Sequence, residues 1–159
     1  MNILVRESSP KDMPQVLALI KELAVFENSP NEVEVTEEIL IKEGFGNVPL
    51  FTCFIAEVNN EIIGMALIYY RFSTWKGRTI HMEDLIVKEK MRSKGIGKAL
   101  YTKVIAYAYE MKVKRIEWAV LDWNKGAIRF YERSGAKVMK NWYITHMEES
   151  GIKNYIATL

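Results

Sequence analysis

Arg92-Ser93-Lys94-Gly95-Ile96-Gly97 is the most informative stretch of this 159-residue chain. It follows an apolar segment, Leu85–Val87, and opens a helical pattern, Ile96–Met111, whose apolar residues recur three or four positions apart. Amide groups at the beginning of a helix lack intrahelical partners, and glycine lets an anion approach them closely. The same turn also carries three cations, at Arg92, Lys94 and Lys98. We therefore predict a phosphate-binding turn, with a plain glycine-rich connection as the alternative.

Hydrophobic periodicity predicts further elements on both sides of this turn. The expected strands are Ile3–Arg6, Leu50–Val58, Ile62–Phe72, Arg78–Lys88, Arg115–Leu121, Lys137–Met147 and Lys153–Leu159. The other expected helices begin after the N-caps Asp12 and Thr36 and, near the end of the chain, span Ala127–Arg133 before a C′ glycine, Gly135. Asn59-Asn60 predicts a tight antiparallel hairpin. Together these elements predict an α/β (α+β) fold with a mixed, mostly antiparallel central sheet and helices on both faces.

Composition limits the class of protein. The chain is 49% hydrophobic and 26% charged, which fits one globular domain over residues 1–159. No apolar run is long enough for a membrane span and the first ten residues do not resemble a signal peptide, so we expect a cytoplasmic protein without a membrane partner. A single cysteine, Cys53, excludes an internal disulfide, and with only two histidines we expect no metal site. Its apolar strand predicts that Cys53 is a buried structural residue, not a nucleophile.

Charge is distributed unevenly along the chain. Residues 1–86 carry 7 Lys/Arg and 13 Asp/Glu, whereas residues 87–159 carry 15 Lys/Arg and 7 Asp/Glu. This asymmetry favours a bipolar site, acidic toward a cationic ligand and basic toward a phosphorylated one, with two solvated faces as the alternative. The acid-rich segment 27–43 is a candidate rim for polycations. No recognition-helix motif or aromatic-basic repeat accompanies the basic half, so we expect no nucleic-acid partner.

Three blocks of the sequence together resemble one superfamily. Arg92-x-x-Gly95-x-Gly97 resembles the acyl-CoA pyrophosphate loop of the GNAT superfamily of N-acetyltransferases, and Met82–Val87 and Asp122–Ala136 look like its two other landmarks. Four shorter motifs look like the spermidine/spermine (diamine) acetyltransferase branch, namely Lys21-Glu22-Leu23-Ala24, Gly44-Phe45-Gly46, Trp75-x-Gly77 and Glu83-Asp84. The resemblance implies a GNAT (acyl-CoA N-acyltransferase) fold and a homodimer.

The resemblance also implies roles for individual residues. The strand at Leu85, Ile86 and Val87 and the residues Arg92, Ser93, Lys94, Gly95, Ile96, Gly97, Lys98, Asn124, Lys125, Gly126 and Ala127 would bind acetyl-CoA. Tyr131 would be the general acid. The amine side would comprise Phe26, Glu27, Trp75, Glu83 and Asp84. Phe26 stands where the polyamine branch often has tyrosine, which puts the choice of amine in question.

The acids at positions 83 and 84 suit the chemistry of amine acetylation. A primary amine has a pKa of about 10 and is a cation at neutral pH, whereas attack on a thioester needs the neutral amine. A general base must therefore take the proton; Glu83 is the best candidate, and Asp84 or Glu27 would hold a charge of the ligand. Successive strand residues face opposite sides, so Glu83 and Asp84 share a pocket only if a bulge intervenes. Solvated charges at a strand end are the alternative.

The predicted activity is transfer of an acetyl group from acetyl-CoA to a primary amine of a small polyamine or diamine, by direct attack in a ternary complex. Two other functions remain open from the sequence. One is acetylation of thialysine or another amino-acid side-chain amine. The other is a non-catalytic regulator that binds acyl-CoA.

Overall fold

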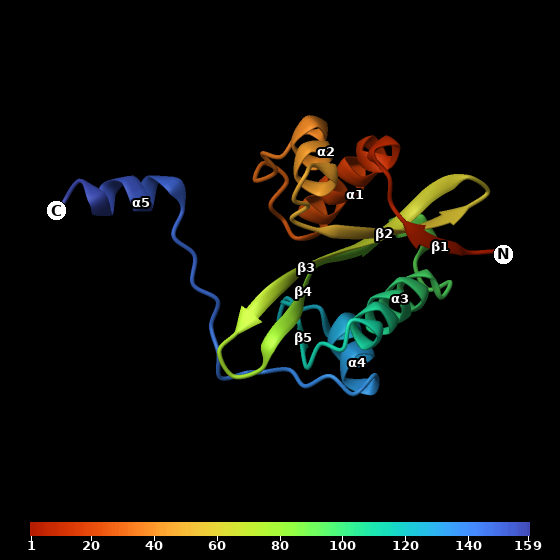
Figure 1. The fold of residues 1–159 in the computed structure, drawn as a ribbon. Coiled ribbons are helices and arrows are strands. Elements are labelled where there is room, and N and C mark those ends of the chain that lie inside the picture. Colours follow the sequence, from red (N-terminus) through yellow and green to blue (C-terminus); the bar gives the residue numbers. More distant parts are fainter. The chain divides into compact units, whose positions relative to one another are not determined.

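A five-stranded sheet is the centre of the first of two compact units, Met1–Ala119 (Figure 1). The structure is a computed structural model that describes residues 1–159, and the second unit is Val120–Leu159. The strands lie in chain order: β1 (Leu4–Glu7), β2 (Thr52–Val58), β3 (Glu61–Ser73), β4 (Gly77–Val87) and β5 (Ile116–Glu117). All neighbours are antiparallel except β4 and β5, which are parallel. The predicted mixed, mostly antiparallel sheet is therefore confirmed.

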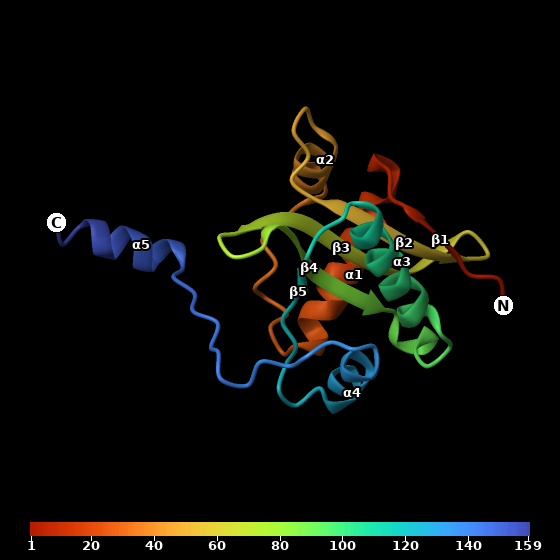
Figure 2. The same cartoon turned by 60° about the horizontal axis from the view of Figure 1, so that its bottom comes forward.

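Helices cover both faces of this sheet, as predicted (Figures 1 and 2). On one face lie α1 (Met13–Phe26) and α2 (Glu37–Phe45), and on the other lies α3 (Ile96–Glu110). The core under α1 and α2 consists of Met13, Val16, Leu19, Leu40, Cys53, Ile55, Ile62, Met65, Leu67 and Ile86. Under α3, the buried residues of the helix are Ile96, Leu100, Tyr101, Val104 and Ala108. In α1 and α3 the buried residues recur at three-to-four spacing, which is the periodicity that predicted these two helices.

Local sequence signals explain where several elements begin and end. Asn59 and Asn60 take φ values of 51° and 65°, the left-handed pair that a tight hairpin between β2 and β3 requires. Thr36 accepts a hydrogen bond from the amide of Ile39 at 3.3 Å, as an N-cap of α2 should. Gly135 has φ 97° just after α4 (Lys125–Arg133). These three predictions are confirmed.

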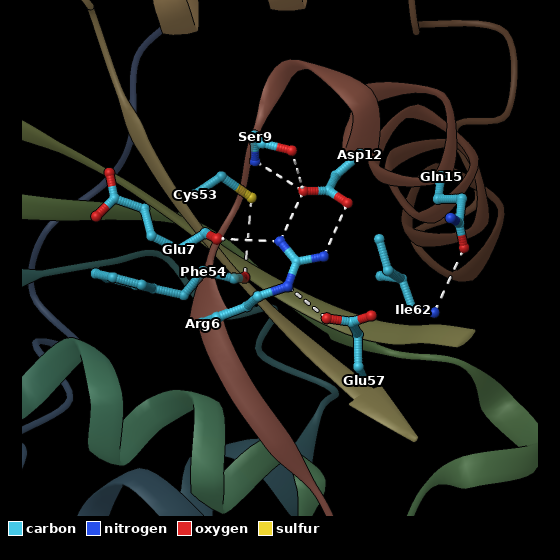
Figure 3. Close-up of polar contacts among 9 residues, drawn as sticks. All are labelled: Arg6, Glu7, Ser9, Asp12, Gln15, Cys53, Phe54, Glu57 and Ile62. Atoms are coloured by element: carbon cyan, nitrogen blue, oxygen red, sulfur yellow. Dashed lines mark hydrogen bonds and ion pairs between the residues drawn. The ribbon is translucent and has the colours of Figure 1, made fainter. Parts of the chain in front are cut away.

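Asp12 precedes α1 as predicted, but its carboxylate serves a different purpose from capping that helix (Figure 3). It accepts hydrogen bonds from the amide and hydroxyl of Ser9, at 2.7 and 2.9 Å, across the short 3-10 helix η1 (Pro10–Asp12). The guanidinium of Arg6 donates to both of its oxygens, at 2.8 and 3.0 Å, and also to Glu57 on β2. We call Arg6, Asp12 and Glu57 the clasp, because they join β1, β2 and the start of α1. Hydrogen bonding from Arg6 lowers the pKa of Asp12 to about 2.

Cys53 is buried in the core, as predicted for a structural cysteine. Burial raises the pKa of its thiol to about 12, so the reactive thiolate is scarce at neutral pH.

Three predicted strands differ from the structure. The segment Lys137–Met147 forms no strand, and Lys153–Leu159 falls largely in a helix, α5 (Glu149–Ile156). A strand needs a neighbour to satisfy its backbone groups, whereas a helix satisfies its own, and Glu149 and Lys153 add an ion pair one turn apart. The strand expected at Arg115–Leu121 is reduced to Ile116–Glu117, which pair with Ile80 and His81 of β4. Its ladder ends where β4 bulges, and a bulge interrupts pairing.

Candidate active site

An acidic pocket of about 470 Å³ lies against the α1 and α2 side of the sheet. Its carboxylates come from Glu27 at the C-cap of α1, Glu43 of α2, Glu32 and Glu34 of the segment between these helices, and Glu83 and Asp84 of β4. Its apolar wall consists of Ile20, Leu23, Ala24, Val33, Val35, Ile39, Leu40, Leu50, Phe51 and Leu67. No lysine or arginine is among the lining residues. The pocket is therefore suited to a ligand with an aliphatic body and positive charge.

A bulge in β4 brings two consecutive acids into this pocket. Leu67 pairs with Asp84 and Ile68 pairs with Met82, so Glu83 is the extra residue of the ladder. In a regular strand these two side chains would face opposite sides of the sheet. The bulge removes that alternation locally, and both residues line the pocket. The sequence predicted that Glu83 and Asp84 share a pocket only if a bulge intervenes, and the structure has that bulge.

Asp84 has the most perturbed carboxyl of the pocket. Burial, followed by the negative charges of Glu83 and Glu27, raises its pKa to about 6. Burial also raises the pKa of Glu27. The charged form of such a carboxylate is stabilised when a cation binds beside it, because the ligand supplies the positive charge that the protein does not. The pocket is thus built to attract an ammonium group.

Glu83 is held by its neighbours on the same face of the sheet. Its Oε2 accepts a hydrogen bond from the hydroxyl of Tyr69 at 2.9 Å and lies 3.6 Å from Nε2 of His81. Nδ1 of His81 lies 3.2 Å from Nη1 of Arg71, which can only donate, so we assign Nδ1 as acceptor and the proton to Nε2. Burial lowers the pKa of His81, in keeping with this neutral ring. Tyr69 and His81 therefore orient one oxygen of Glu83.

The turn before α3 has the geometry expected for an anion. Ser93 and Gly95 take left-handed φ values of 61° and 84°, and Gly95 is the N-cap of α3. The first α-helical bond in α3 runs from the amide of Ala99 to the carbonyl of Gly95 at 3.0 Å, so the amides of residues 96–98 are left for another partner. A side chain at Gly95 would meet no atom within 4 Å, so its backbone conformation, not space, favours glycine. Arg92, Lys94 and Lys98 flank these amides. The residues of this turn fit a pyrophosphate.

The end of β4 beside this turn has one unpaired edge. In an antiparallel pair, the backbone groups of successive residues point alternately toward the neighbouring strand and away from it. The amide of Lys88 donates to the carbonyl of Ile63 at 2.8 Å, so Lys88 and Ile86 direct their groups toward β3, while Leu85 and Val87 direct theirs away from it. β5 pairs with β4 only at Ile80 and His81, so no strand takes these groups. The Val87 carbonyl accepts from Nε of Arg92 at 3.1 Å.

The remaining predicted coenzyme residues lie in the second unit, Val120–Leu159. Oδ1 of Asn124 accepts from the amide of Ala127 at 3.2 Å and so caps α4, while Nζ of Lys125 donates to the carbonyl of Asp122. Tyr131 lies in α4, and its carbonyl accepts from the hydroxyl of Ser134 at 2.6 Å. The helix predicted over Ala127–Arg133 is confirmed as α4, which begins two residues earlier, at Lys125. The roles of Asn124, Lys125, Gly126, Ala127 and Tyr131 remain predictions.

Two residues expected on the amine side lie elsewhere. Trp75 is 83% exposed in the turn between β3 and β4 and is not among the pocket residues. Phe26 is also absent from the pocket lining, and its ring lies 4.9 Å from the guanidinium carbon of Arg92. Of the five residues predicted for the amine side, Glu27, Glu83 and Asp84 therefore line one pocket, whereas Phe26 and Trp75 do not.

The apolar wall of the pocket was not predicted from the sequence. Ile20, Leu23 and Glu27 recur at helical spacing, so this part of the wall was readable as one stripe of α1. Phe51 was not readable, because its ring packs over Gly44 of α2, where a methyl group would lie 2.5 Å from it. That contact depends on how two elements meet, which local sequence does not encode.

No group of three or more His, Cys, Asp or Glu is placed to hold a metal ion. None of the helices combines the length and apolarity that crossing a bilayer requires.

Comparison with known proteins places this geometry in context. Residues 16–136 match the family described as Acetyltransferase (GNAT) family. A thialysine N-epsilon-acetyltransferase from Bos taurus is 34% identical over 162 residues, covering 95% of each chain. The spermidine/spermine N(1)-acetyltransferase-like protein 1 of Homo sapiens is 33% identical over 139 residues, which are 83% of this chain and 20% of that protein.

A solved structure supports the same fold. The crystal structure of a predicted acetyltransferase with acetyl-CoA from Clostridium acetobutylicum superposes with a TM-score of 0.74 at 18% identity. The match covers 92% of this chain and 97% of that one.

Proposed function

Because the chain belongs to the acetyltransferase (GNAT) family and is an N-acetyltransferase, we propose that it acetylates a primary amine of a small polyamine or diamine. Acetyl-CoA is the expected acetyl donor of such an enzyme. The observation that carries the choice of acceptor is the pocket with six carboxylates and no lysine or arginine.

A polyamine matches this pocket better than an amino acid does. Its several ammonium groups neutralise several carboxylates, and its methylene segments suit the apolar wall. An amino acid brings a carboxylate of its own, which would face repulsion from the six acids without a cation to hold it. Charge complementarity therefore favours an acceptor with two or more amines.

The proposal assigns a chemical role to each of these residues. Glu83, fixed by Tyr69 and His81, takes the proton from the attacking amine, either directly or through a water molecule. Asp84 and Glu27 bind a positive charge of the same ligand. The bound coenzyme supplies a thioester and is held by the strand at Leu85, Ile86 and Val87, on the edge where Leu85 and Val87 direct their backbone groups, and by the turn Arg92–Lys98. The amine attacks the carbonyl carbon of the thioester directly in a ternary complex, the carbon–sulfur bond breaks, and Tyr131, in the role that the family resemblance implies, gives the leaving sulfur a proton.

Thialysine is the second candidate acceptor. It is favoured by the name of the Bos taurus relative, which matches 95% of this chain. The same base and the same coenzyme turn would serve both acceptors. The two candidates therefore differ only in whether the pocket accepts the carboxylate of an amino acid.

Transfer of labelled acetyl groups to a panel of amines tests the proposal. We expect higher kcat/KM for spermidine, spermine and a diamine than for thialysine, lysine or ornithine. Preference for thialysine would replace the polyamine proposal with the second candidate. Absence of transfer to every amine, with coenzyme binding intact, would contradict the proposed function.

We also propose that the enzyme is a cytoplasmic homodimer with one domain over residues 1–159. The family match, residues 16–136, runs through both units and supports one domain. Large apolar side chains are exposed in the last part of the chain, at Met139, Trp142, Tyr143, Ile144, Met147, Ile152, Tyr155, Ile156 and Leu159. Such a run supports burial in a subunit contact. Light scattering at several concentrations should give the mass of a dimer, whereas a constant 18.4 kDa would contradict it.

A further inference from the structure

Helix α1 presents two different stripes in its last two turns. One stripe, with Ile20, Leu23 and Ala24 and continued by the C-cap residue Glu27, lines the acidic pocket. The other consists of Glu22 and Phe26, which are four residues apart and therefore share a face. At 100° per residue, the two stripes are separated by roughly a third of a turn. The second stripe contacts the segment that leads into the coenzyme turn.

Glu22 contacts the beginning of that segment. Its Oε1 accepts a hydrogen bond from the amide of Glu89 at 2.9 Å, although the two residues are 67 positions apart. Glu89 is the first residue of the 3-10 helix η2 (Glu89–Met91), and its N-cap residue, Lys88, makes no side-chain cap. Amides at the beginning of a helix need an outside acceptor. Glu22 therefore supplies from α1 the cap that η2 lacks locally.

Phe26 contacts the end of the same segment. The guanidinium carbon of Arg92 lies 4.9 Å from the centre of the Phe26 ring, within cation–π range. Nε of the same guanidinium donates to the carbonyl of Val87 at 3.1 Å. Arg92 is thus held from two sides, by a ring from α1 and by the end of β4. Both contacts fix where the turn that follows Arg92 leaves the sheet.

We propose that Glu22 and Phe26 are positioning residues for the coenzyme turn, through which α1 sets the place of Arg92 and of the amides that begin α3. This inference rests on the proposed function, because it takes the turn Arg92–Lys98 as the coenzyme site. It assigns Phe26 to the coenzyme side of the enzyme, in place of the amine side that the family resemblance implied. It also makes α1 the element that contacts both substrates' sites.

Binding of CoA, measured by titration calorimetry without turnover, tests the assignment. Replacing the ring in Phe26→Leu should raise the Kd for CoA about threefold. Loss of the acceptor in Glu22→Ala should raise it about fivefold. Phe26→Tyr keeps the ring and Glu22→Gln keeps an acceptor oxygen, so both should stay near the wild-type Kd. Val25→Ala, at a residue of α1 that is 62% exposed, is the matched control.

Steady-state kinetics separate positioning from a general loss of structure. In Phe26→Leu and Glu22→Ala, the KM for acetyl-CoA should rise while the KM for the amine stays unchanged. A rise in the amine KM with an unchanged Kd for CoA would overturn the inference and return Phe26 to the amine side. If wild-type protein itself fails to bind CoA, the proposed function fails, and that outcome is visible before any variant is compared.

Discussion

Asp12 and Asp84 are two aspartates of the same unit whose surroundings shift the carboxyl pKa in opposite directions. Asp12 belongs to the clasp, where Arg6 and Ser9 donate to its carboxylate and hold its pKa at about 2. Asp84 lies in the acidic pocket, where burial and the charges of Glu83 and Glu27 raise its pKa to about 6. The first carboxylate is satisfied within the fold, whereas the second lacks a cation there.

The contrast indicates which acids stabilise the protein and which serve a ligand. A carboxylate with a complete set of donors contributes to folding, because its charge is more stable in the native state than in the unfolded chain. A carboxylate buried beside other acids costs stability and is kept where a ligand needs it. The chain therefore uses the same residue type for two purposes, and the partners of each residue distinguish them.

The largest effect is expected for Glu83→Gln. Removing the proposed base should lower kcat about 100-fold with spermidine and acetyl-CoA, while the fold stays intact because glutamine keeps a side-chain oxygen to accept from Tyr69. Glu61→Gln, at an acid paired with Lys88 outside the pocket, is the control and should retain activity. If Asp84→Asn loses kcat and Glu83→Gln does not, the two acids exchange roles.

Asn substitutions at the two aspartates should change stability in opposite directions. At pH 7, Asp12→Asn should lose ~2 kcal/mol in urea unfolding, because Arg6 loses a charged partner. The Asp12 pKa is lowered from 3.8 to about 2, so its contribution is present above pH 3.8 and disappears as the pH falls through 2.

The charge of Asp84 should change the stability of the fold in the opposite direction. Its pKa is raised from 3.8 to about 6, so its charge destabilises the fold increasingly as the pH rises from 3.8 to 6. Asp84→Asn should therefore be more stable than wild type at pH 7 and equal to it below pH 3.8. Stability losses of similar size in both variants at pH 7 would show that the comparison is wrong.

Amine binding should also depend on the charge of Asp84. As the pH falls below 6, protonation removes that charge, and the Kd of spermidine should rise up to about tenfold per pH unit. Calorimetry from pH 7.5 to 5 measures this rise. Asp12→Asn should show the same dependence as wild type, and Asp84→Asn a flatter one. A Kd that stays constant in wild type would remove Asp84 from the ligand site.

The smallest effects are expected at the rim. Glu32→Gln and Glu34→Gln should each raise the KM for spermidine about threefold at low salt and less at high salt, because exposed charges are screened. Glu37→Gln and Glu38→Gln are matched controls from the same acid-rich segment, since neither residue lines the pocket. Equal effects at all four positions would indicate general attraction by the acidic half instead of a defined rim.

Sequence reasoning succeeded where the signal was local. The Asn59-Asn60 hairpin, the Thr36 cap and the turn at Gly95 each depend on the conformational preferences of one or two residues. The superfamily was recognisable for a related reason, since its coenzyme turn is a contiguous motif.

Features that depend on distant partners were missed or left conditional. Whether Glu83 and Asp84 share a pocket depended on the ladder with β3, and the length of β5 depended on where β4 bulges. Phe26 illustrates the same limit, because its partner Arg92 lies 66 positions away. The last segment has strand-like composition, yet Glu149–Ile156 is helical, since alternation of apolar residues does not supply a neighbouring strand.

The buried thiol of Cys53 has a practical consequence. With a pKa of about 12 and only 2% of its surface exposed, it should be nearly inert toward disulfide reagents while the protein is folded. Because it is the only cysteine, every labelled molecule records one opening of the core. The chain thus carries its own reporter of unfolding kinetics, with no engineered label required.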